Sequence, residues 1–96
     1  MQIQWSVNAQ AQLQAAHEYV AEDNRSAAQQ QSAAVVRAIE QLVHFPEMGR
    51  PGRVAGTREL VILGTPLIVA YSLQRDTVSI LAVLHGARRW PRRFVD

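Results

Sequence analysis

The segment TRELVILGTPLIVAYSLQRDTVSILAVLH, residues 57–85, decides the fold of this chain. It contains three β-branched and apolar runs, which predict strands over Thr57–Leu63, Pro66–Leu73 and Thr77–His85. Only Gly64-Thr65 and Gln74-Arg75-Asp76 separate these runs. Connections this short join neighbouring strands, so the sequence predicts an antiparallel meander.

The first half of the chain predicts one short strand and two helices. Gln2–Trp5 alternates and ends at Ser6, a good helix N-cap. Apolar residues then recur at helical spacing over Val7–Glu22 and again over Arg25–Val43, and Pro46 stops the second helix. A connection of two residues makes the helices an antiparallel hairpin. The prediction is a single α+β domain over residues 1–96, with the element order β-α-α-β-β-β.

We expect the helical hairpin to cover one face of the sheet. Strand alternation places Thr77, Ser79, Leu81, Val83 and His85 on the opposite face. That face carries more apolar surface than a small free monomer tolerates, so the sequence predicts a partner site there.

Composition narrows the possible chemistry. The 96 residues are 48% hydrophobic and include no cysteine, which excludes disulfides and a cysteine nucleophile. No apolar run approaches the roughly 18 residues that cross a bilayer, and the N-terminus lacks a signal-peptide pattern. We expect a cytoplasmic protein with no membrane partner. The three histidines have no metal-ligand spacing, and the glycine turns precede a strand, so no metal or nucleotide cofactor is expected.

Charge is divided unevenly along the chain. Residues 1–49 carry a formal balance of −3 and residues 50–95 a balance of +6, and every basic residue is an arginine. An arginine-rich second half suits an anionic partner, either nucleic acid or an acidic protein. Codon composition is the alternative explanation for the absence of lysine.

Three signals in order along the second half resemble a known family. They are the glycine–arginine loop Phe45–Arg53 closing with Gly56–Leu60, the strand that ends in Tyr71, and the strand that runs into Leu84-His85-Gly86-Ala87-Arg88-Arg89-Trp90-Pro91. Together they resemble the RelE/ParE superfamily of toxins from bacterial type II toxin–antitoxin modules. The resemblance covers nearly the whole chain, and the predicted element order is also that of this superfamily.

The resemblance implies two candidate mechanisms. In RNA-cleaving members, basic side chains surround the scissile phosphate, and Arg58 and Arg88 occupy corresponding places, with His85 as the acid or base. Those members often have a tyrosine near the chain end, whereas this chain has none after Tyr71. The glycine–arginine loop is more similar to ParE-type members, which are associated with poisoning DNA gyrase. The resemblance therefore implies a gyrase inhibitor that performs no bond chemistry, with a ribosome-dependent mRNA endoribonuclease as the alternative. A third possibility is an inactive toxin that only binds its antitoxin.

The expected partners are a cognate antitoxin and gyrase. The acidic C-terminal segment of the antitoxin would fold onto the toxin as an amphipathic helix and form a hetero-oligomer. The residues expected to contact the target or the antitoxin are Arg50, Arg53, Arg58, Arg88, Arg89 and Trp90.

Several of these residues also have structural interpretations. The loop around Pro51 can fix the crossover into the sheet, and Glu59 can pair with a neighbouring arginine. Tyr71 can pack with its hydroxyl satisfied, His85 can simply end a strand, and Trp90 can fold back over the core.

Overall fold

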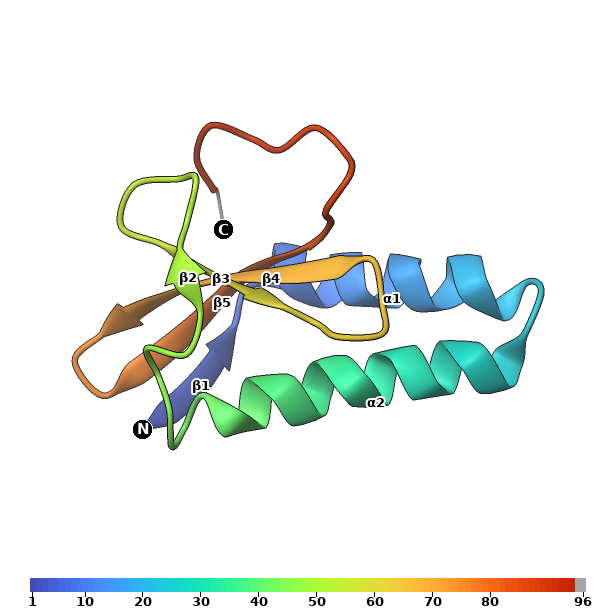
Figure 1. Cartoon of the computed structure of the whole chain (residues 1–96), viewed down its shortest axis with the longest axis horizontal. Helices are drawn as coiled ribbons and strands as arrows, with labels where there is room; N and C mark the ends of the chain where they lie inside the picture. The colour runs from blue at the N-terminus through green and yellow to red at the C-terminus, as the bar shows by residue number, and fades with distance from the viewer. Residues whose placement is uncertain (95–96) are drawn as a thin grey trace.

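The computed structural model describes residues 1–94, two residues short of the predicted domain end. The elements follow one another as β1 (Gln2–Trp5), α1 (Val7–Ala21), α2 (Arg25–Gln41), β2 (Arg50–Pro51), β3 (Arg58–Val61), β4 (Leu67–Gln74) and β5 (Thr77–His85) (Figure 1). The α+β class, the helical hairpin and the order of elements are confirmed. The sequence missed β2, which has only two residues.

The five strands form one mixed sheet in the order β1-β5-β4-β3-β2. Neighbours pair antiparallel except β1, which lies parallel to β5. The meander β3–β4–β5 is therefore as predicted, whereas β3 ends earlier than expected. It stops at Val61 because Ile62 and Thr65 form the turn into β4, with the Thr65 backbone N–H donating to the Ile62 carbonyl at 3.2 Å.

Side-chain caps begin both helices. The Ser6 hydroxyl accepts from the Ala9 backbone N–H at 2.9 Å, and the Asn24 side chain accepts from Ala27 at 3.0 Å. Each cap satisfies one of the amide groups that a helix start leaves unpaired. Within the described residues, neither helix is long and apolar enough to cross a membrane.

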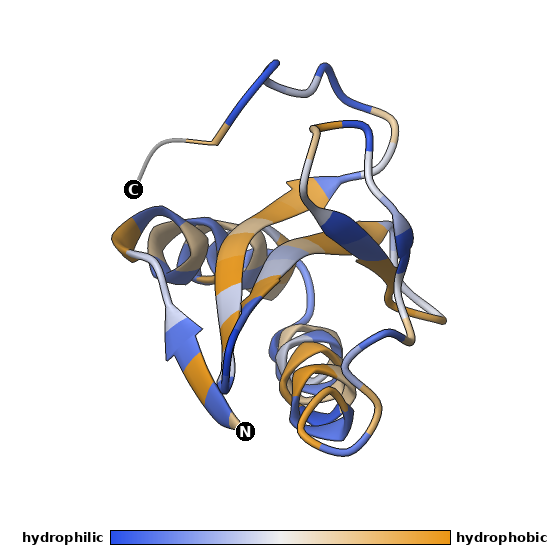
Figure 2. Ribbon diagram, turned by 90° about the vertical axis from the view of Figure 1, so that its left-hand side faces the viewer, coloured by the Kyte–Doolittle hydropathy of each residue, from blue (hydrophilic) through white to orange (hydrophobic). Residues whose placement is uncertain are grey.

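The core lies between the sheet and the helical hairpin. The two helices run antiparallel, with α2 below one face of the sheet and α1 beside β5 (Figure 2). This core is made up of fully or nearly fully buried side chains from α2, the sheet and the residues that directly follow α2 and β3: Val35, Ile39, Leu42, Ile62, Val69, Tyr71, Val78 and Ile80.

A β-bulge in β5 changes the predicted faces of the sheet. Ala70 pairs with Ala82 and Tyr71 pairs with Ile80, so Leu81 is an extra residue on β5. The bulge is held by α1 and its N-cap: Ser6 Oγ donates to the Leu81 carbonyl at 3.1 Å, and Gln12 Oε1 accepts from the Val83 backbone N–H at 2.8 Å.

The predicted placement of Val83 and His85 on the open face is therefore wrong. One extra residue inverts the alternation beyond it. Val83 joins the core, and His85 pairs with Leu67, a member of the same core cluster.

The sequence predicts an open apolar surface on the face of the sheet away from the helical hairpin, and this prediction is wrong. Ile68, Ala70 and Ala82 on that face are buried. The segment that follows β5 begins against them, because Gly86 packs next to the Ile68 side chain and its N–H donates to the Pro66 carbonyl at 2.9 Å. The chain's own C-terminal segment thus occupies the side of the sheet that was predicted for a partner (Figures 1 and 2).

Candidate functional site

The loop between β2 and β3 is held by hydrogen bonds between its own residues. Gly52 N–H donates to the Thr57 carbonyl at 2.8 Å, and the Thr57 hydroxyl donates to the Val54 carbonyl at 2.7 Å. A Cβ atom on Gly52 would clash with the Thr57 side chain, and Gly56 has a φ of 80°, which favours glycine. The predicted structural role of this loop is confirmed.

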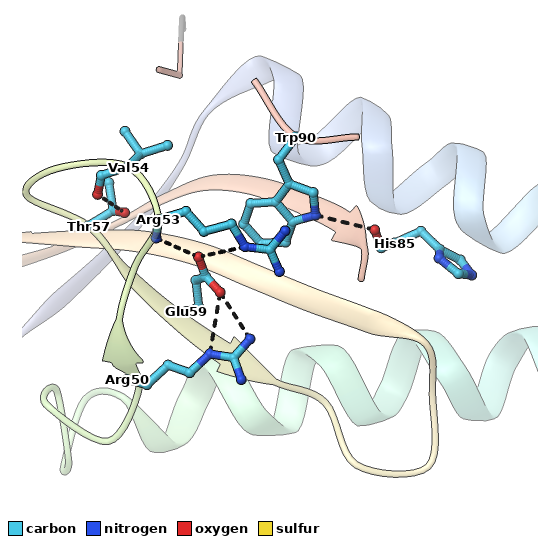
Figure 3. A network of polar contacts seen from close by, with 7 residues as sticks. All are labelled: Arg50, Arg53, Val54, Thr57, Glu59, His85 and Trp90. Carbon is cyan, nitrogen blue, oxygen red and sulfur yellow. Dashed lines mark hydrogen bonds and ion pairs between the residues drawn. The ribbon is translucent and has the colours of Figure 1, made fainter. Parts of the chain in front are cut away.

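Glu59 organises the arginines of the loop. Its carboxylate is almost fully buried, and it accepts from Arg50 Nη2 at 3.1 Å and from the Arg53 backbone N–H at 2.8 Å (Figure 3). Arg53 Nε lies 3.4 Å from the second carboxylate oxygen. The prediction that Glu59 pairs with a neighbouring arginine is confirmed, and the partners are Arg50 and Arg53.

Trp90 completes this cluster from the C-terminal segment. The Arg53 guanidinium carbon lies 3.8 Å from the centre of a Trp90 ring, a cation–π contact (Figure 3). Trp90 Nε1 donates to the His85 carbonyl at 3.4 Å. Trp90 therefore folds back and joins two segments that lie far apart in the sequence.

Arg50 of β2 and Arg53 of the loop remain available to a partner. The side chain of Arg50 is 53% exposed and that of Arg53 is 46% exposed, whereas that of Glu59 is 2% exposed. Glu59 thus fixes the orientation of both guanidinium groups from below while their outer N–H groups face solvent.

The ionisation of Glu59 follows from these contacts. Burial by itself would raise the pKa of Glu59, but the N–H of Arg53, the hydrogen bond from Arg50 and the charges of both arginines outweigh burial. The net result is a pKa below the ordinary value for a glutamate. Glu59 is therefore a carboxylate at neutral pH.

Glu59→Gln should lower the free energy of unfolding near neutral pH by about 1–2 kcal/mol, because charge-assisted hydrogen bonds are replaced by neutral ones. A depressed folded-state pKa contributes stability above the unfolded pKa, and this contribution disappears as the pH falls through the folded value. Urea unfolding should show that the free energies of unfolding of the two proteins differ at about pH 7 and become more similar at about pH 3. If the difference in the free energy of unfolding is the same at both pH values, Glu59 does not carry the negative charge assigned to it.

Arg58 lies on the other side of the sheet from this cluster. It pairs across the strands with Tyr71, on the core face, and its Nη1 donates to the carbonyls of Gly49 at 2.8 Å and Glu47 at 3.3 Å. Arg58 therefore holds the segment that leads from α2 into β2. It does not join Arg50 and Arg53.

Tyr71 holds the same segment. Its buried hydroxyl accepts from the Gly49 N–H at 2.9 Å and donates to the Pro46 carbonyl at 2.8 Å. Burial raises the pKa of Tyr71, so the hydroxyl keeps the proton that it donates. The prediction of a packed tyrosine with a satisfied hydroxyl is confirmed.

His85 and Arg58 do not form one reactive centre. Arg58 is aligned with Tyr71 and His85 with Leu67, which separates them by about 13 Å along the strands and about 10 Å across them. The His85 ring accepts from the Ala87 N–H at 3.2 Å and points away from the Glu59 cluster (Figure 3). Arg88 follows His85 in the chain, and its side chain is exposed.

The other histidines have structural contacts. His17 Nδ1 lies 2.9 Å from the Ser32 hydroxyl across the helical hairpin, and His44 meets Phe45 edge to face. Among residues 1–94, no group of His, Cys, Asp or Glu side chains could hold a metal ion.

Sequence reasoning named Arg53 and Trp90 separately but missed their contact. Residues 37 positions apart share no local pattern that predicts such a stack. It also missed an apolar hollow at the end of α2, lined by residues 45–48, where Phe45 and Met48 are about half exposed. Two apolar residues close to Pro46, beyond the end of a helix, were the available signal for this hollow.

Comparison with known proteins agrees with this architecture. The family described as the ParE toxin of type II toxin–antitoxin systems, parDE, matches residues 3–90. A candidate toxin of Sinorhizobium fredii, Y4kP, is 38% identical over 90 residues, covering 94% of this chain and 93% of its own length. Toxin RelE2 of Caulobacter vibrioides is 32% identical over 87 residues, which span 91% of this chain and 97% of the relative.

A solved structure also resembles this chain. It is described as the chromosomal ParDE toxin–antitoxin system from P. aeruginosa, and it matches with a TM-score of 0.76 and 26% sequence identity. The match covers 86% of this chain and 92% of that one.

Proposed function

Because the chain belongs to the ParE toxin family of type II toxin–antitoxin systems, we propose that it arrests bacterial growth by binding DNA gyrase in the cytoplasm. The toxin would hold gyrase on its cleaved DNA and so cause breaks without performing bond chemistry itself. The ParE-type members that the sequence resembles are associated with this activity.

The separation of Arg58 from His85 is the observation that carries this proposal. RNA cleavage by a ribose 2′-hydroxyl needs a base, an acid and a charged group within hydrogen-bond reach of one phosphate. Here Arg58 is bound to the backbone of the segment before β2, and His85 lies at the far end of another strand. An inhibitor that acts by binding needs only an exposed, oriented surface, which Arg50 and Arg53 provide.

The cellular response to induction tests this choice. We expect a DNA-damage response with filamentation, and we expect His85→Ala to arrest growth as strongly as the unchanged protein, because no reaction passes through the imidazole. Growth, cell length and a DNA-damage reporter give the readout, and an induced vector without the gene is the control.

The opposite pattern would favour an endoribonuclease that acts on the ribosome and mRNA. One relative carries the name RelE2, so this alternative has a specific observation behind it. Rapid arrest of translation, mRNA cleavage at translated codons and loss of both in His85→Ala would overturn the gyrase proposal. Expression without any growth arrest would instead indicate an inactive toxin.

The family also implies a cognate antitoxin as partner. We infer that an acidic C-terminal antitoxin segment lies against the exposed arginines and forms an amphipathic helix over apolar side chains. The hollow at residues 45–48 offers such apolar surface, and the half-exposed arginines offer donors for carboxylates. Binding would cover the same groups that we assign to the target.

Charge reversal of Arg88 and Arg89 tests the antitoxin surface. Both side chains are exposed, so Arg88→Glu/Arg89→Glu should fold normally and weaken antitoxin binding at least about tenfold at low salt. Co-purification and titration with the product of the neighbouring gene measure this change. Unchanged affinity would exclude the C-terminal arginines from the interface, and Arg25→Glu/Arg37→Glu on α2 is the matched control.

A further inference from the structure

Six of the ten basic residues form one surface, here called the arginine surface. They come from β2, from the loop between β2 and β3 and from the C-terminal segment, and these parts lie on the same side of the sheet, away from α2 (Figures 1 and 2). Neither residues 50–57 nor residues 86–94 contain an acidic side chain. The arginine surface consists of Arg50, Arg53, Arg88, Arg89, Arg92 and Arg93.

Internal contacts assemble this surface from its two segments. The stack of Arg53 on Trp90 joins the loop to the C-terminal segment, and Glu59 orients Arg50 and Arg53 (Figure 3). The one carboxylate involved is buried, so it positions the guanidinium groups and offers little charge to a partner. Glu59 is therefore a positioning residue of the arginine surface.

Among the residues that the structure describes, the side chains of the four arginines of the C-terminal segment have no such partner. These side chains are exposed, and none of them forms a hydrogen bond or ion pair with residues 1–94. Exposed arginines gathered on one side of a protein are suited to bind an extended anion.

The spacing of these charges fits a long polyanion. Arg88 to Arg93 can span up to about 17 Å, and duplex DNA carries one negative charge for about every 1.7 Å of its axis. Phosphate groups accept two N–H donors from one guanidinium, and the exposed sides of Arg50 and Arg53 keep such donors free. None of these contacts requires a particular base sequence.

We propose that the arginine surface binds the phosphate backbone of duplex DNA, so that the toxin touches DNA as well as protein when it acts on gyrase. The binding of DNA is inferred independently of the proposed function, whereas the contact with DNA during action on gyrase rests on that function. The acidic segment of the antitoxin would compete for the same arginines and release the DNA.

Binding of a sequence-neutral duplex of about 30 base pairs tests the proposal without gyrase. If the toxin makes four to five phosphate contacts, a plot of the logarithm of the association constant against the logarithm of the salt concentration should have a slope of about −4. Between about 50 and about 200 mM salt, the affinity should then fall by about 250-fold.

Two variants should each reduce the slope by about 2, since each removes two arginines from the arginine surface. The first variant is Arg92→Gln/Arg93→Gln. The second is Arg50→Gln/Arg53→Gln, combined with Glu59→Gln so that no buried carboxylate is left without its charged partners. Arg25→Gln/Arg37→Gln on α2 removes the same number of arginines elsewhere and should leave the slope unchanged.

Three results would overturn the inference: no binding to the duplex, an equal loss in the α2 variant, or tighter binding to a polyglutamate peptide than to DNA. The last result would assign the arginine surface to carboxylates alone. Gyrase inhibition is measured separately. A toxin that inhibits gyrase without binding DNA refutes only this inference, and one that binds DNA without inhibiting gyrase refutes only the proposed function.

Discussion

Replacing Arg50 and Arg53 with glutamine, together with Glu59→Gln, is expected to weaken gyrase inhibition at least about tenfold. Both guanidinium groups are half exposed and are held in fixed orientations by the buried carboxylate. Oriented charged donors at the centre of an interface commonly contribute about 2 kcal/mol or more when they are removed. The measurement is the toxin concentration that halves DNA supercoiling by purified gyrase.

The triple substitution is chosen so that its effect can be interpreted. Arg50→Gln/Arg53→Gln alone would leave the buried carboxylate of Glu59 without its charged partners, which destabilises the fold. Arg25→Gln/Arg37→Gln is the matched control for the loss of two arginines, and circular dichroism verifies that each variant is folded. If the triple variant is folded and inhibits gyrase as well as the control does, these arginines do not contact the target.

Tyr71→Phe is expected to lower the free energy of unfolding by about 2–3 kcal/mol. The change removes one hydroxyl and leaves the buried N–H of Gly49 and the carbonyl of Pro46 without their partner. In a domain of this size the melting temperature should fall by about 10–20 °C. Tyr19→Phe, which alters an exposed tyrosine on α1, should change stability by less than about 0.5 kcal/mol.

Gly49→Ala tests the same contact from the other side. A Cβ atom on Gly49 would lie 2.7 Å from the Tyr71 ring and 2.9 Å from the Glu59 carbonyl, so the segment must shift and lose its hydrogen bonds. We expect a cost of about 2–3 kcal/mol, whereas Gly56→Ala, with open space around it, should cost about 1 kcal/mol. Equal effects of the two substitutions in urea unfolding would show that Tyr71 does not fix this segment.

The sequence predicted the regular elements well because their signals are local. β5 was predicted with the bounds it has, Thr77–His85, from one apolar run between two turns. The bulge at Leu81 could not be predicted in this way. The alternation of side chains along a strand does not show where an extra residue interrupts the pairing. The position of the bulge depends on hydrogen bonds from Ser6 and Gln12, which belong to another segment.

The candidate site was predictable residue by residue but not as an arrangement. Arg50, Arg53, Trp90 and the pairing of Glu59 were all anticipated, whereas the stack that joins the loop to the C-terminal segment depends on tertiary structure. The resemblance places Arg58 with Arg88 around a phosphate, and the sequence also predicts that Arg58 contacts the target or the antitoxin together with Arg50 and Arg53. Strand alternation sends its side chain to the opposite face from Glu59, where it binds backbone carbonyls.

The most direct test of the account is a supercoiling and cleavage assay with purified gyrase and the purified toxin. We predict that supercoiling is inhibited, that gyrase-linked DNA breaks accumulate, and that the antitoxin added in equal amount reverses both. Unchanged supercoiling and no cleaved DNA at saturating toxin would contradict the central claim.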